Sequence, residues 1–395
     1  MSEKRRDSKG RVLRTGESQR KDGRYLYKYV DANGQSQSIY SWKLVATDKV
    51  PAGKRDCISL RDKEKEIQND LAEGISTANR KLTVSDLYAK YVALHSNVKR
   101  NTQRNRQFTA KLLANDKIGS MNISAVKPSD AKEWAIRMDD TYSYNVINNT
   151  KRAISAAFRV AIGDGLVRKN PFEFALKTVL HDDTEERAAL TEEQEKQLLE
   201  YILNTERYRP YYDAILLLLR TGLRISEFCG LTVNDLDFDN RVININHQLC
   251  YLSGTDFYIE TPKSKKSIRK VPMCTEVYQT FKKVLEKRNG LQSVEIDGYS
   301  DCVFLQDDGT PYCPYHYRKV LLLMVPSYNS THREQLPPIS PHILRHTFCT
   351  RLASKNMNPK NLQYIMGHAS IDITMNVYAH PSIESAQNEI ANLMG

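Results

Sequence analysis

Residues 340–347 of this chain read Ser-Pro-His-Ile-Leu-Arg-His-Thr. The pattern predicts the start of a helix, because Ser340 can cap a helix N-terminus and Pro341 suits the first turn. Three polar residues of the segment are three and four positions apart and therefore project from one side of that helix, namely His342, Arg345 and His346. The segment thus predicts a convergence of polar, partly cationic side chains.

Two further features follow this helix, the tripeptide Gly367-His368-Ala369 and Tyr378. The chain has 22 tyrosines, so Tyr378 taken alone is most simply a core aromatic residue. Its position downstream of clustered histidines and an arginine singles it out as a candidate nucleophile.

The spacing of four residues between His342 and His346 also resembles a pair of metal ligands. A zinc-protease helix needs Glu directly after the first His, where this chain has Ile343. The cationic Arg345 beside the pair further disfavours a metal ion. We therefore expect neither a metal nor any other cofactor. A purely structural role for the histidines is the remaining alternative, and their clustering argues against it.

Two upstream segments carry residues of related chemistry. Residues 221–228 read Thr-Gly-Leu-Arg-Ile-Ser-Glu-Phe and follow the strongly apolar stretch 215–219. Glu227 lies one helical turn after Arg224 and can orient its guanidinium group. Residues 261–266 read Thr-Pro-Lys-Ser-Lys-Lys, a basic turn between two predicted strands that can hold a lysine over a DNA strand.

The region that contains these segments is predicted to be an α+β domain, residues 187–395. A polar linker over 181–187 precedes it, and a capping box at Thr191 and Gln194 opens its first helix. The expected elements are helices over 192–203 and 210–220, then strands over 241–247, 256–261 and 267–272, then further helices. The strands are expected to form one hairpin-rich sheet.

Residues 82–176 are predicted to form an all-helical domain. Thr83 caps the first helix, a second begins near Thr102, and others cover about 128–138 and 143–162. In the last helix apolar residues alternate with Lys151, Arg152 and Arg159, which predicts one core face and one basic face. A basic helical surface can grip phosphates without reading bases, although a plain solvated surface remains the alternative.

Residues 1–81 are predicted to form a small sheet packed on a helix. Residues 24–30 alternate with period two, Asn33-Gly34 is a hairpin turn signal, residues 37–42 form the return strand, and residues 11–15 supply a third strand. Ser59 and Asp62 begin the helix. The tyrosines of the first strand are expected mainly to pack on that helix.

The composition favours a polyanionic partner. The 395 residues carry 58 Lys or Arg and 47 Asp or Glu, a formal charge of +11. Residues 1–60 alone hold 14 Lys or Arg and 7 Asp or Glu, which indicates a dedicated DNA-contacting module. The seven scattered cysteines indicate neither disulfides nor a thiolate zinc site. With no apolar run of membrane-spanning length and no signal-like N-terminus, the chain is expected to be a soluble cytoplasmic protein.

Together these segments resemble the tyrosine recombinases, and most of all the integrases of conjugative transposons, over essentially the whole chain. In that family the catalytic set runs in a fixed order, and the matching positions here are Arg224, Lys263, His342, Arg345, His368 and Tyr378. The resemblance implies an N-terminal domain that binds arm-type DNA sites, a helical domain that binds core-type sites and a catalytic C-terminal domain.

The chemistry of phosphodiester cleavage suits these residue types. Arg224 and Arg345 can hold the non-bridging oxygens, on which negative charge develops. Tyr378 needs help to lose its proton, and His342 is the candidate base. The resemblance implies Lys263 as the general acid, with Lys265 and Lys266 as neighbours, and His368 as a group that binds the phosphate or positions the tyrosine. No metal or ATP is required.

The resemblance also implies partners and leaves two alternatives. A thin apolar stripe after Tyr378, at Ile383, Ala386, Ile390 and Leu393, suits a tail helix that docks on a neighbouring protomer. We therefore expect a homo-tetramer on double-stranded DNA, an accessory excision factor and association with the bacterial nucleoid. The alternatives are a type IB topoisomerase, which the N-terminal domain disfavours, and a catalytically silent DNA-binding regulator, which the complete catalytic set disfavours.

Overall fold

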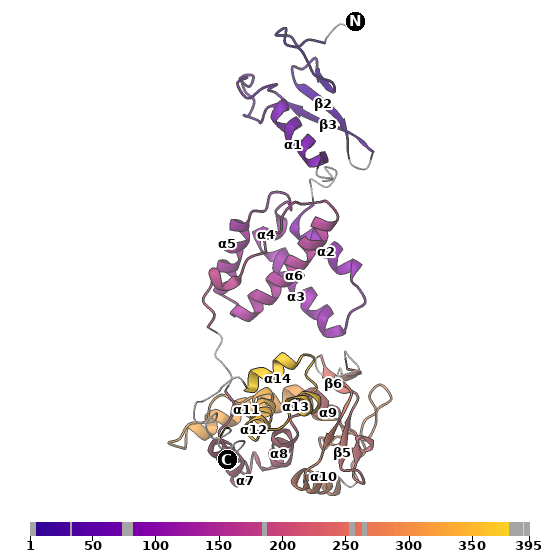
Figure 1. The fold of residues 1–395 in the computed structure, drawn as a ribbon, viewed down its shortest axis with the longest axis vertical. Coiled ribbons are helices and arrows are strands. Elements are labelled where there is room, and N and C mark those ends of the chain that lie inside the picture. The colour runs from indigo at the N-terminus through magenta and orange to yellow at the C-terminus, as the bar shows by residue number, and fades with distance from the viewer. Residues whose placement is uncertain are drawn as a thin grey trace. The chain divides into compact units, whose positions relative to one another are not determined.

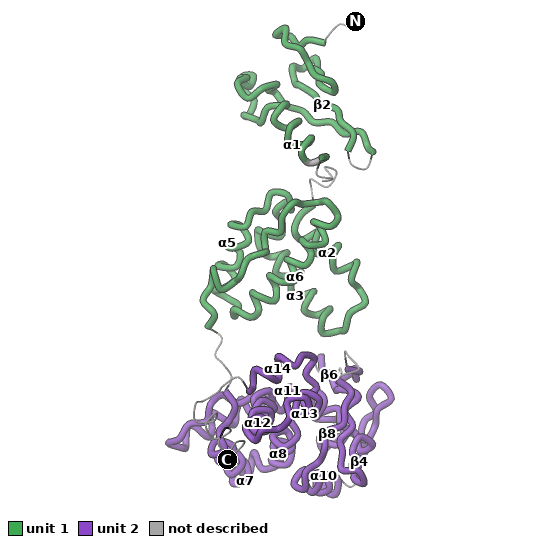
Figure 2. Tube along the Cα trace, in the orientation of Figure 1, with its two compact units in different colours: residues 1–185 green, residues 186–395 purple. Residues whose placement is uncertain are grey.

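The protein is described by a computed structural model that divides into two compact units, residues 1–185 and residues 186–395 (Figure 2). Each unit is described by itself below. The structure describes residues 5–31, 34–72, 82–183, 188–252, 257–262, 267–288, 290–378 and 390. Part of the expected linker, residues 184–187, therefore lies outside the described residues.

The N-terminal part of the first unit is a small antiparallel sheet with one helix (Figure 1). Its elements, with strand order β1-β2-β3, are β1 (Glu17–Gln19), β2 (Tyr25–Val30), β3 (Ser36–Ser41) and α1 (Leu60–Ala72). Alternation along β2 turns Tyr25 and Tyr27 to one side, where both are buried against Leu60 of α1 and other apolar residues. The predicted hairpin strands, helix and tyrosine packing are confirmed, while Asn33 of the turn lies outside the described residues.

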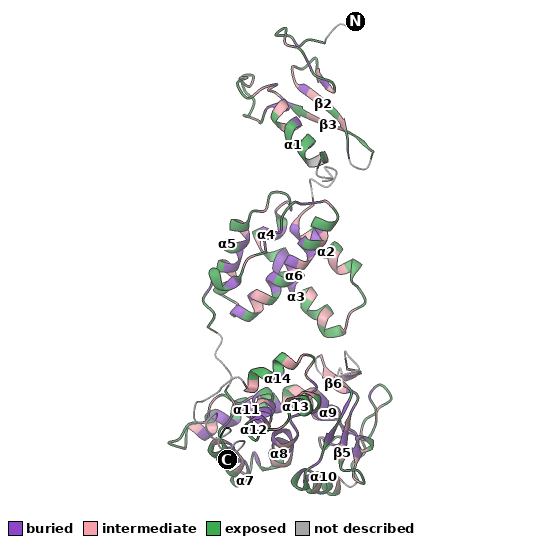
Figure 3. Cartoon of the chain, in the orientation of Figure 1, coloured by how far each residue is buried: buried purple, intermediate pink, exposed green. Residues whose placement is uncertain are grey.

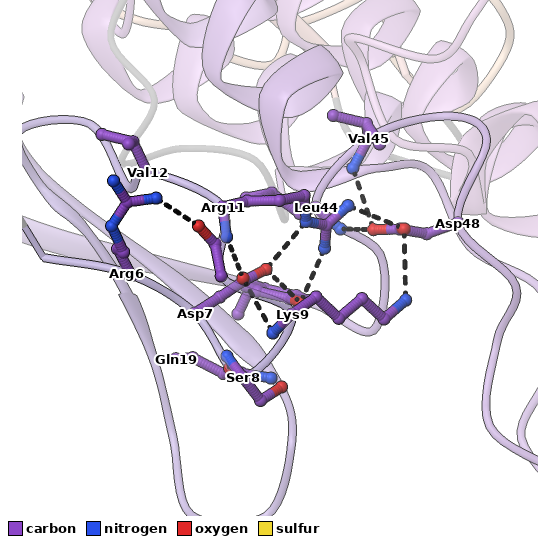
Figure 4. A network of polar contacts seen from close by, with 12 residues as sticks. Arg6, Asp7, Ser8, Lys9, Arg11, Val12, Gln19, Leu44, Val45 and Asp48 are labelled. Atoms are coloured by element: carbon purple, nitrogen blue, oxygen red, sulfur yellow. Dashed lines mark hydrogen bonds and ion pairs between the residues drawn. The ribbon is translucent and has the colours of Figure 1, made fainter.

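The third strand of this sheet differs from the prediction. It is β1, and the strand expected over residues 11–15 is wrong. The reason is the side chain of Asp7, which accepts hydrogen bonds from the backbone N of Arg11 at 2.7 Å and from its Nε at 2.8 Å (Figure 4). Asp48 binds Arg11 Nη1 at 2.8 Å. Because the amide of Arg11 is already bound to a carboxylate, pairing in this segment is limited to an isolated bridge between Val12 and Arg6.

The second part of the first unit is helical, as predicted. Its helices are α2 (Val84–Leu94), α3 (Arg100–Asn115), α4 (Lys117–Ser120), α5 (Pro128–Asp139), α6 (Tyr144–Gly163) and the 3₁₀ turn η2 (Leu176–Thr178). Thr83 caps α2 with a full capping box. The buried face of α6 (Figure 3) contributes to a core in which the ring of Phe172 contacts both Trp134 and Phe158. This core is separate from that of the N-terminal sheet.

Lys151 of α6 does not lie on the basic face expected for this helix. Its side chain is buried, and Nζ donates to the carbonyl oxygen of Phe172 at 3.1 Å. Position 151 lies one helical turn from the buried residues Ile147 and Ile154, so it belongs to the apolar stripe. Arg152 and Arg159 are exposed, as expected.

The second unit has the predicted α+β composition. Its helices are α7 (Glu192–Asn204), η3 (Arg209–Tyr211), α8 (Tyr212–Thr221), α9 (Ile225–Gly230), η4 (Val233–Asp235), α10 (Thr275–Lys287), α11 (Pro314–Asn329), α12 (Pro341–Ser354), α13 (Pro359–Met366) and α14 (Ile371–Tyr378). Its strands are β4 (Leu236–Asp237), β5 (Val242–Ile245), β6 (Gln248–Tyr251), β7 (Phe257–Glu260) and β8 (Arg269–Pro272). The caps predicted at Thr191 and Ser340 are confirmed.

The described strands of this unit form two sheets, whereas the sequence predicted one. β4, β5 and β8 make one antiparallel sheet, and β6 pairs with β7 in another. The chain changes partners at His247, whose buried ring binds the carbonyl oxygen of Gly230 at 2.6 Å through Nε2. β5 lies within the strand predicted over 241–247, and β6, which follows His247 and packs against α9, was not predicted.

The core of this unit surrounds α8. Residues 214–219 of this helix are all buried, so α8 has no polar face over this stretch and lies inside the domain. It packs against α12, the helix that residues 340–347 predicted. Among the described residues, no helix is both long and apolar enough to cross a membrane.

Candidate active site

Arg224 lies in the short link between α8 and α9. After Thr221 the chain turns at Gly222, whose φ of 62° is a left-handed conformation that glycine adopts without steric cost. A Cβ atom at Gly222 would lie 2.2 Å from Cδ1 of Phe348, so the position has no room for a side chain. Glu227 accepts hydrogen bonds from Arg224 N at 2.9 Å and from Nη1 at 2.8 Å. The predicted orientation of Arg224 by Glu227 is confirmed.

Arg345 lies in the second turn of α12, and its side chain is buried. Nη1 donates to the carbonyl oxygen of Gly222 at 2.7 Å, and Nη2 donates to that of Met366. Burial, together with the charge of Arg224, lowers the pKa of Arg345 to about 9. The guanidinium group stays protonated at neutral pH, in a place that is short of compensating negative charge.

The C-terminal end of α13 binds three arginines through consecutive backbone carbonyls. The bonds are Arg269 Nε to Ile365 O at 2.6 Å, Arg345 Nη2 to Met366 O, and Arg224 Nη2 to Gly367 O at 2.7 Å. Carbonyls of a last helical turn lack partners within the helix and carry partial negative charge. One helix end therefore gathers guanidinium groups from three different elements. We name Arg224, Arg269, Arg345 and Glu227 the arginine cluster.

Arg269 is a member of the cluster that the sequence prediction missed. Its side chain is 0% exposed, and Nη1 and Nη2 donate to the two carboxylate oxygens of Glu227 at 3.0 and 2.8 Å. Burial raises the pKa of Glu227, but Arg269 and Arg224 outweigh it and lower the pKa to about 2. A signal was present, because alternation along β8 places Arg269 on the same side as the buried Val271.

His368 directly follows the glycine that ends α13, and it is half-buried. Its Nδ1 lies 3.0 Å from the hydroxyl oxygen of Thr374 in α14. Burial and the charges of Arg345 and Arg224 lower the pKa of His368 to about 4. At neutral pH the ring is therefore uncharged and offers one hydrogen-bond donor and one acceptor.

The histidines of α12 lie in different surroundings from Arg345. His342 is exposed and His346 is half-buried, whereas Arg345 faces α8 and α13. Residues three apart are offset by about 60° around a helix. The predicted polar side of the helix thus has a buried edge, at Arg345, and an exposed edge, at His342.

Tyr378 ends α14, and its hydroxyl donates to the carbonyl oxygen of Met357, between α12 and α13. The ring packs on a small apolar cluster that includes Cys349, Leu362 and Met366. Burial raises the pKa of Tyr378 above its ordinary value. In this conformation the hydroxyl is bound to a backbone oxygen and is kept as a neutral phenol.

The structure therefore gathers some of the predicted site residues and not others. Arg224 and Arg345 meet at the helix end that leads into His368, while the Tyr378 hydroxyl has a separate partner. Lys263 and the rest of its basic turn, residues 263–266, lie outside the described residues. Most of the predicted tail also lies outside them, and Ile390, which is described, is 58% exposed.

The arginine cluster is suited to a planar or tetrahedral oxyanion. Three guanidinium groups face one carboxylate, so the cluster carries an excess of positive charge. An arginine has five N–H donors, and the bonds of Arg224 and of Arg345 to described residues use two donors each. The remaining donors can bind the non-bridging oxygens of a phosphodiester by charge-assisted hydrogen bonds.

Comparison with known proteins agrees with this chemistry. Residues 1–71 match the family model described as the DNA binding domain of Tn916 integrase, and residues 188–384 match that of the phage integrase family. The transposases of transposon Tn916 from Enterococcus faecalis and of transposon Tn1545 from Streptococcus pneumoniae are each 55% identical over 394 residues, which cover 100% of this chain and 97% of theirs.

A solved relative has the same fold over most of the chain. The Tn1549 transposon integrase, in complex with a circular intermediate DNA, superposes with a TM-score of 0.76 and 49% identity over 79% of this chain and 99% of that chain. This chain belongs to the phage integrase family and is a tyrosine-type site-specific DNA recombinase. The predicted family, multidomain fold class and enzyme class are confirmed.

Proposed function

We propose that this integrase cuts and rejoins DNA at the arginine cluster, with Tyr378 as the nucleophile and a 3′-phosphotyrosyl bond as the intermediate. The observation that carries the proposal is the convergence of Arg224 and Arg345 on the end of α13, with Glu227 as the one carboxylate of the cluster. A scissile phosphate would supply the negative charge that this place lacks. The reaction serves to integrate and excise a mobile element.

In the proposed step, the Tyr378 oxygen attacks phosphorus and the bond from phosphorus to the 5′-oxygen breaks. His342 takes the phenolic proton, and Lys263 gives a proton to the leaving 5′-oxygen. Arg224 and Arg345 stabilise the charge that develops on the non-bridging oxygens. The product retains a phosphoester bond, so a 5′-hydroxyl from a second strand can reverse the step without ATP.

The surroundings of the histidines fit these roles. The exposed His342 is open to solvent, to which a general base can pass its proton. The neutral ring of His368 can bind the phosphate or position the tyrosine without adding a further charge. Tyr378 has to leave the carbonyl oxygen of Met357 before it attacks, so we expect DNA binding to release that hydrogen bond.

The decisive experiment maps the covalent junction on a suicide substrate that carries an element end. The wild-type protein should form a covalent complex, and peptide mapping should place the phosphate on Tyr378. Tyr378→Phe should abolish the complex, whereas Tyr364→Phe, at a 53% exposed tyrosine of α13, should retain it. A junction at another residue, or a covalent complex with Tyr378→Phe, would refute the proposal. Relaxation of DNA without paired sites would favour the topoisomerase alternative.

We further propose three functional domains, with arm-type sites bound by residues 1–81, core-type sites by residues 82–176 and catalysis in residues 187–395. Support comes from the excess of basic residues in 1–60, from the exposed Arg152 and Arg159 of α6, and from the match of residues 1–71 to a DNA-binding domain. Removal of residues 1–81 should abolish footprints on arm-type sites and leave those on core-type sites. Loss of both would contradict this division.

We also propose that four protomers assemble on DNA and that this complex is associated with the bacterial nucleoid. An accessory factor is proposed to promote excision of the element. The apolar stripe after Tyr378, of which Ile390 is exposed, supports the tetramer. The accessory factor and the nucleoid association rest on the family resemblance alone. Cross-linking of a synaptic complex should yield tetramers, and a complex with one protomer per site pair would refute the assembly. Addition of cell extract should raise the excision rate of the purified protein if a factor is required.

A further inference from the structure

We propose that Arg269 is a positioning residue of the cleavage reaction and that it sets the place of Arg224 through Glu227 and the end of α13. The inference rests on the proposed role of Arg224 as a phosphate clamp. Arg269 itself cannot reach DNA in this conformation, because its side chain is fully buried. Any effect on the reaction has to pass through the groups that it holds.

Arg269 contacts both partners that the Arg224 guanidinium group has among the described residues. The first is Glu227, whose two oxygens accept a forked pair of bonds from Arg269 at 3.0 and 2.8 Å. Such a planar fork fixes the orientation of a carboxylate as well as its position. Glu227 then presents Oε1 to Arg224 Nη1 at 2.8 Å.

The second partner of Arg224 is the carbonyl oxygen of Gly367, and Arg269 packs directly against this glycine. An added Cβ at Gly367 would lie 3.1 to 3.2 Å from three atoms of the Arg269 guanidinium group. Arg269 Nε also binds the carbonyl oxygen of Ile365, two residues earlier, at 2.6 Å. Arg269 therefore binds Glu227 directly, packs against Gly367 and binds the same helix end at Ile365.

Electrostatics argue that Arg269 is not present for stability alone. Glu227 could neutralise Arg224 without a second arginine, whereas Arg269 adds a buried positive charge that contributes to the lowered pKa of Arg345 and of His368. Buried ion pairs are often no more stabilising than well-packed apolar residues. The geometry of the fork is what an apolar residue could not reproduce.

The test is a single-turnover cleavage assay of the full-length protein with Arg269→Lys. Lysine keeps the charge, but its single ammonium group cannot make the fork and the bond to Ile365 together. Two suicide substrates are compared, an ordinary phosphodiester and one with a methyl group in place of one non-bridging oxygen. The methyl group removes the charge that Arg224 would stabilise, so cleavage of that substrate depends less on the clamp.

We expect Arg269→Lys to slow cleavage of the ordinary substrate by roughly 10- to 100-fold, the scale of a small misplacement of a catalytic group. DNA affinity should be unchanged. The ratio of the wild-type cleavage rate to the variant's rate should be smaller on the methylated substrate than on the ordinary one, and the same should hold for Arg224→Ala. Arg288→Lys is the matched control, because Arg288 is an 11% exposed arginine paired with Asp301 at 3.0 Å in the same unit. It should cleave both substrates at the wild-type rate.

The outcomes separate the two levels of the proposal. The positioning role is overturned if Arg269→Lys cleaves at the wild-type rate or loses the same factor in cleavage rate on both substrates. In that case Arg224→Ala still loses more on the ordinary substrate than on the methylated one, so the clamp assignment stands. If Arg224→Ala cleaves the ordinary substrate at the wild-type rate, or loses the same factor on both substrates, the clamp assignment fails and the inference fails with it. Should Arg269→Lys not fold, Arg269→Gln relieves the crowding of positive charge and is judged by the same pattern.

Discussion

Replacement of Gly222 by alanine should destabilise the catalytic unit far more than an ordinary glycine substitution. The φ of 62° costs an L-residue about 1 kcal/mol. The new Cβ would also lie 2.2 Å from Cδ1 of Phe348, and such overpacking costs about 1–3 kcal/mol. The expected total is about 2–4 kcal/mol, a sizeable part of a typical domain stability of about 5–15 kcal/mol.

The catalytic unit needs its own probe of unfolding. Both tryptophans, Trp42 and Trp134, lie in the first unit, so their fluorescence reports on that unit and should not change. Cys229 is 1% exposed in the second unit, and its reaction with a thiol reagent under native conditions reports opening of that core. Gly222→Ala should raise the labelling rate of Cys229 by roughly 30- to 700-fold.

Two controls distinguish the backbone strain of the positive φ from the steric overlap with Phe348. Gly298 also has a positive φ, of 81°, but an added Cβ meets nothing within 4 Å, so Gly298→Ala should raise labelling by only roughly 5-fold. Phe348→Leu should relieve the overlap when combined with Gly222→Ala, giving a favourable coupling in a double-mutant cycle. Equal effects of the two glycine variants, or no coupling to position 348, would show that the close approach to Phe348 has no energetic weight.

Three further predictions follow from individual contacts. The pKa of His368 is about 4 in the folded protein, against an ordinary value of 6.5. Its contribution to the free energy of unfolding is therefore complete above pH 6.5 and is lost as the pH falls towards 4. The urea midpoint of His368→Asn should consequently fall less between pH 7 and pH 4 than the midpoint of wild type does. Thr374→Val removes the hydroxyl that binds His368 and should slow cleavage by roughly 2- to 10-fold at unchanged DNA affinity, with Thr374→Ser restoring the rate. Because Lys151 is buried, Lys151→Met should leave the salt dependence of DNA binding unchanged. Arg159→Ala should reduce the slope of log affinity against log salt concentration by about 1. The opposite pattern in a salt titration would contradict the assignment of the two faces of α6.

Local signals predicted the helices well. The caps at Thr83, Thr191 and Ser340 each lie where the sequence placed a helix start, because a cap satisfies amides within four residues of itself. The errors in the sheets have a different origin. Asp7 withdraws the backbone amide of Arg11 from strand pairing. His247 binds Gly230 at the end of the predicted strand 241–247, and the strand β6 that follows it was not predicted. The His247 contact joins residues 17 positions apart, which no short window of sequence compares. The Asp7 contact is local, but period-two alternation does not show that a carboxylate will bind the amide of Arg11.

The candidate site was predictable as a set of residue types but not as a geometry. Motif order singled out Arg224 and Arg345, and helical spacing predicted the hydrogen bond that Arg224 donates to Glu227. Arg269 comes from a strand end 45 positions after Arg224, and only the packing of α13 brings the two together. The bond of Tyr378 to the carbonyl oxygen of Met357 likewise depends on how three helices meet.

The arginine cluster is held largely by main-chain oxygen atoms, and this affects how the protein can vary over time. A carbonyl is present whatever the side chain, so positions 365 and 366 are free to exchange apolar residues without loss of an acceptor. Position 367 has no such freedom, because its φ of 61° and the nearby Arg269 both require glycine. Exchange of one apolar residue for another at positions 365 and 366 should therefore leave cleavage activity intact, whereas any replacement of Gly367 should reduce it.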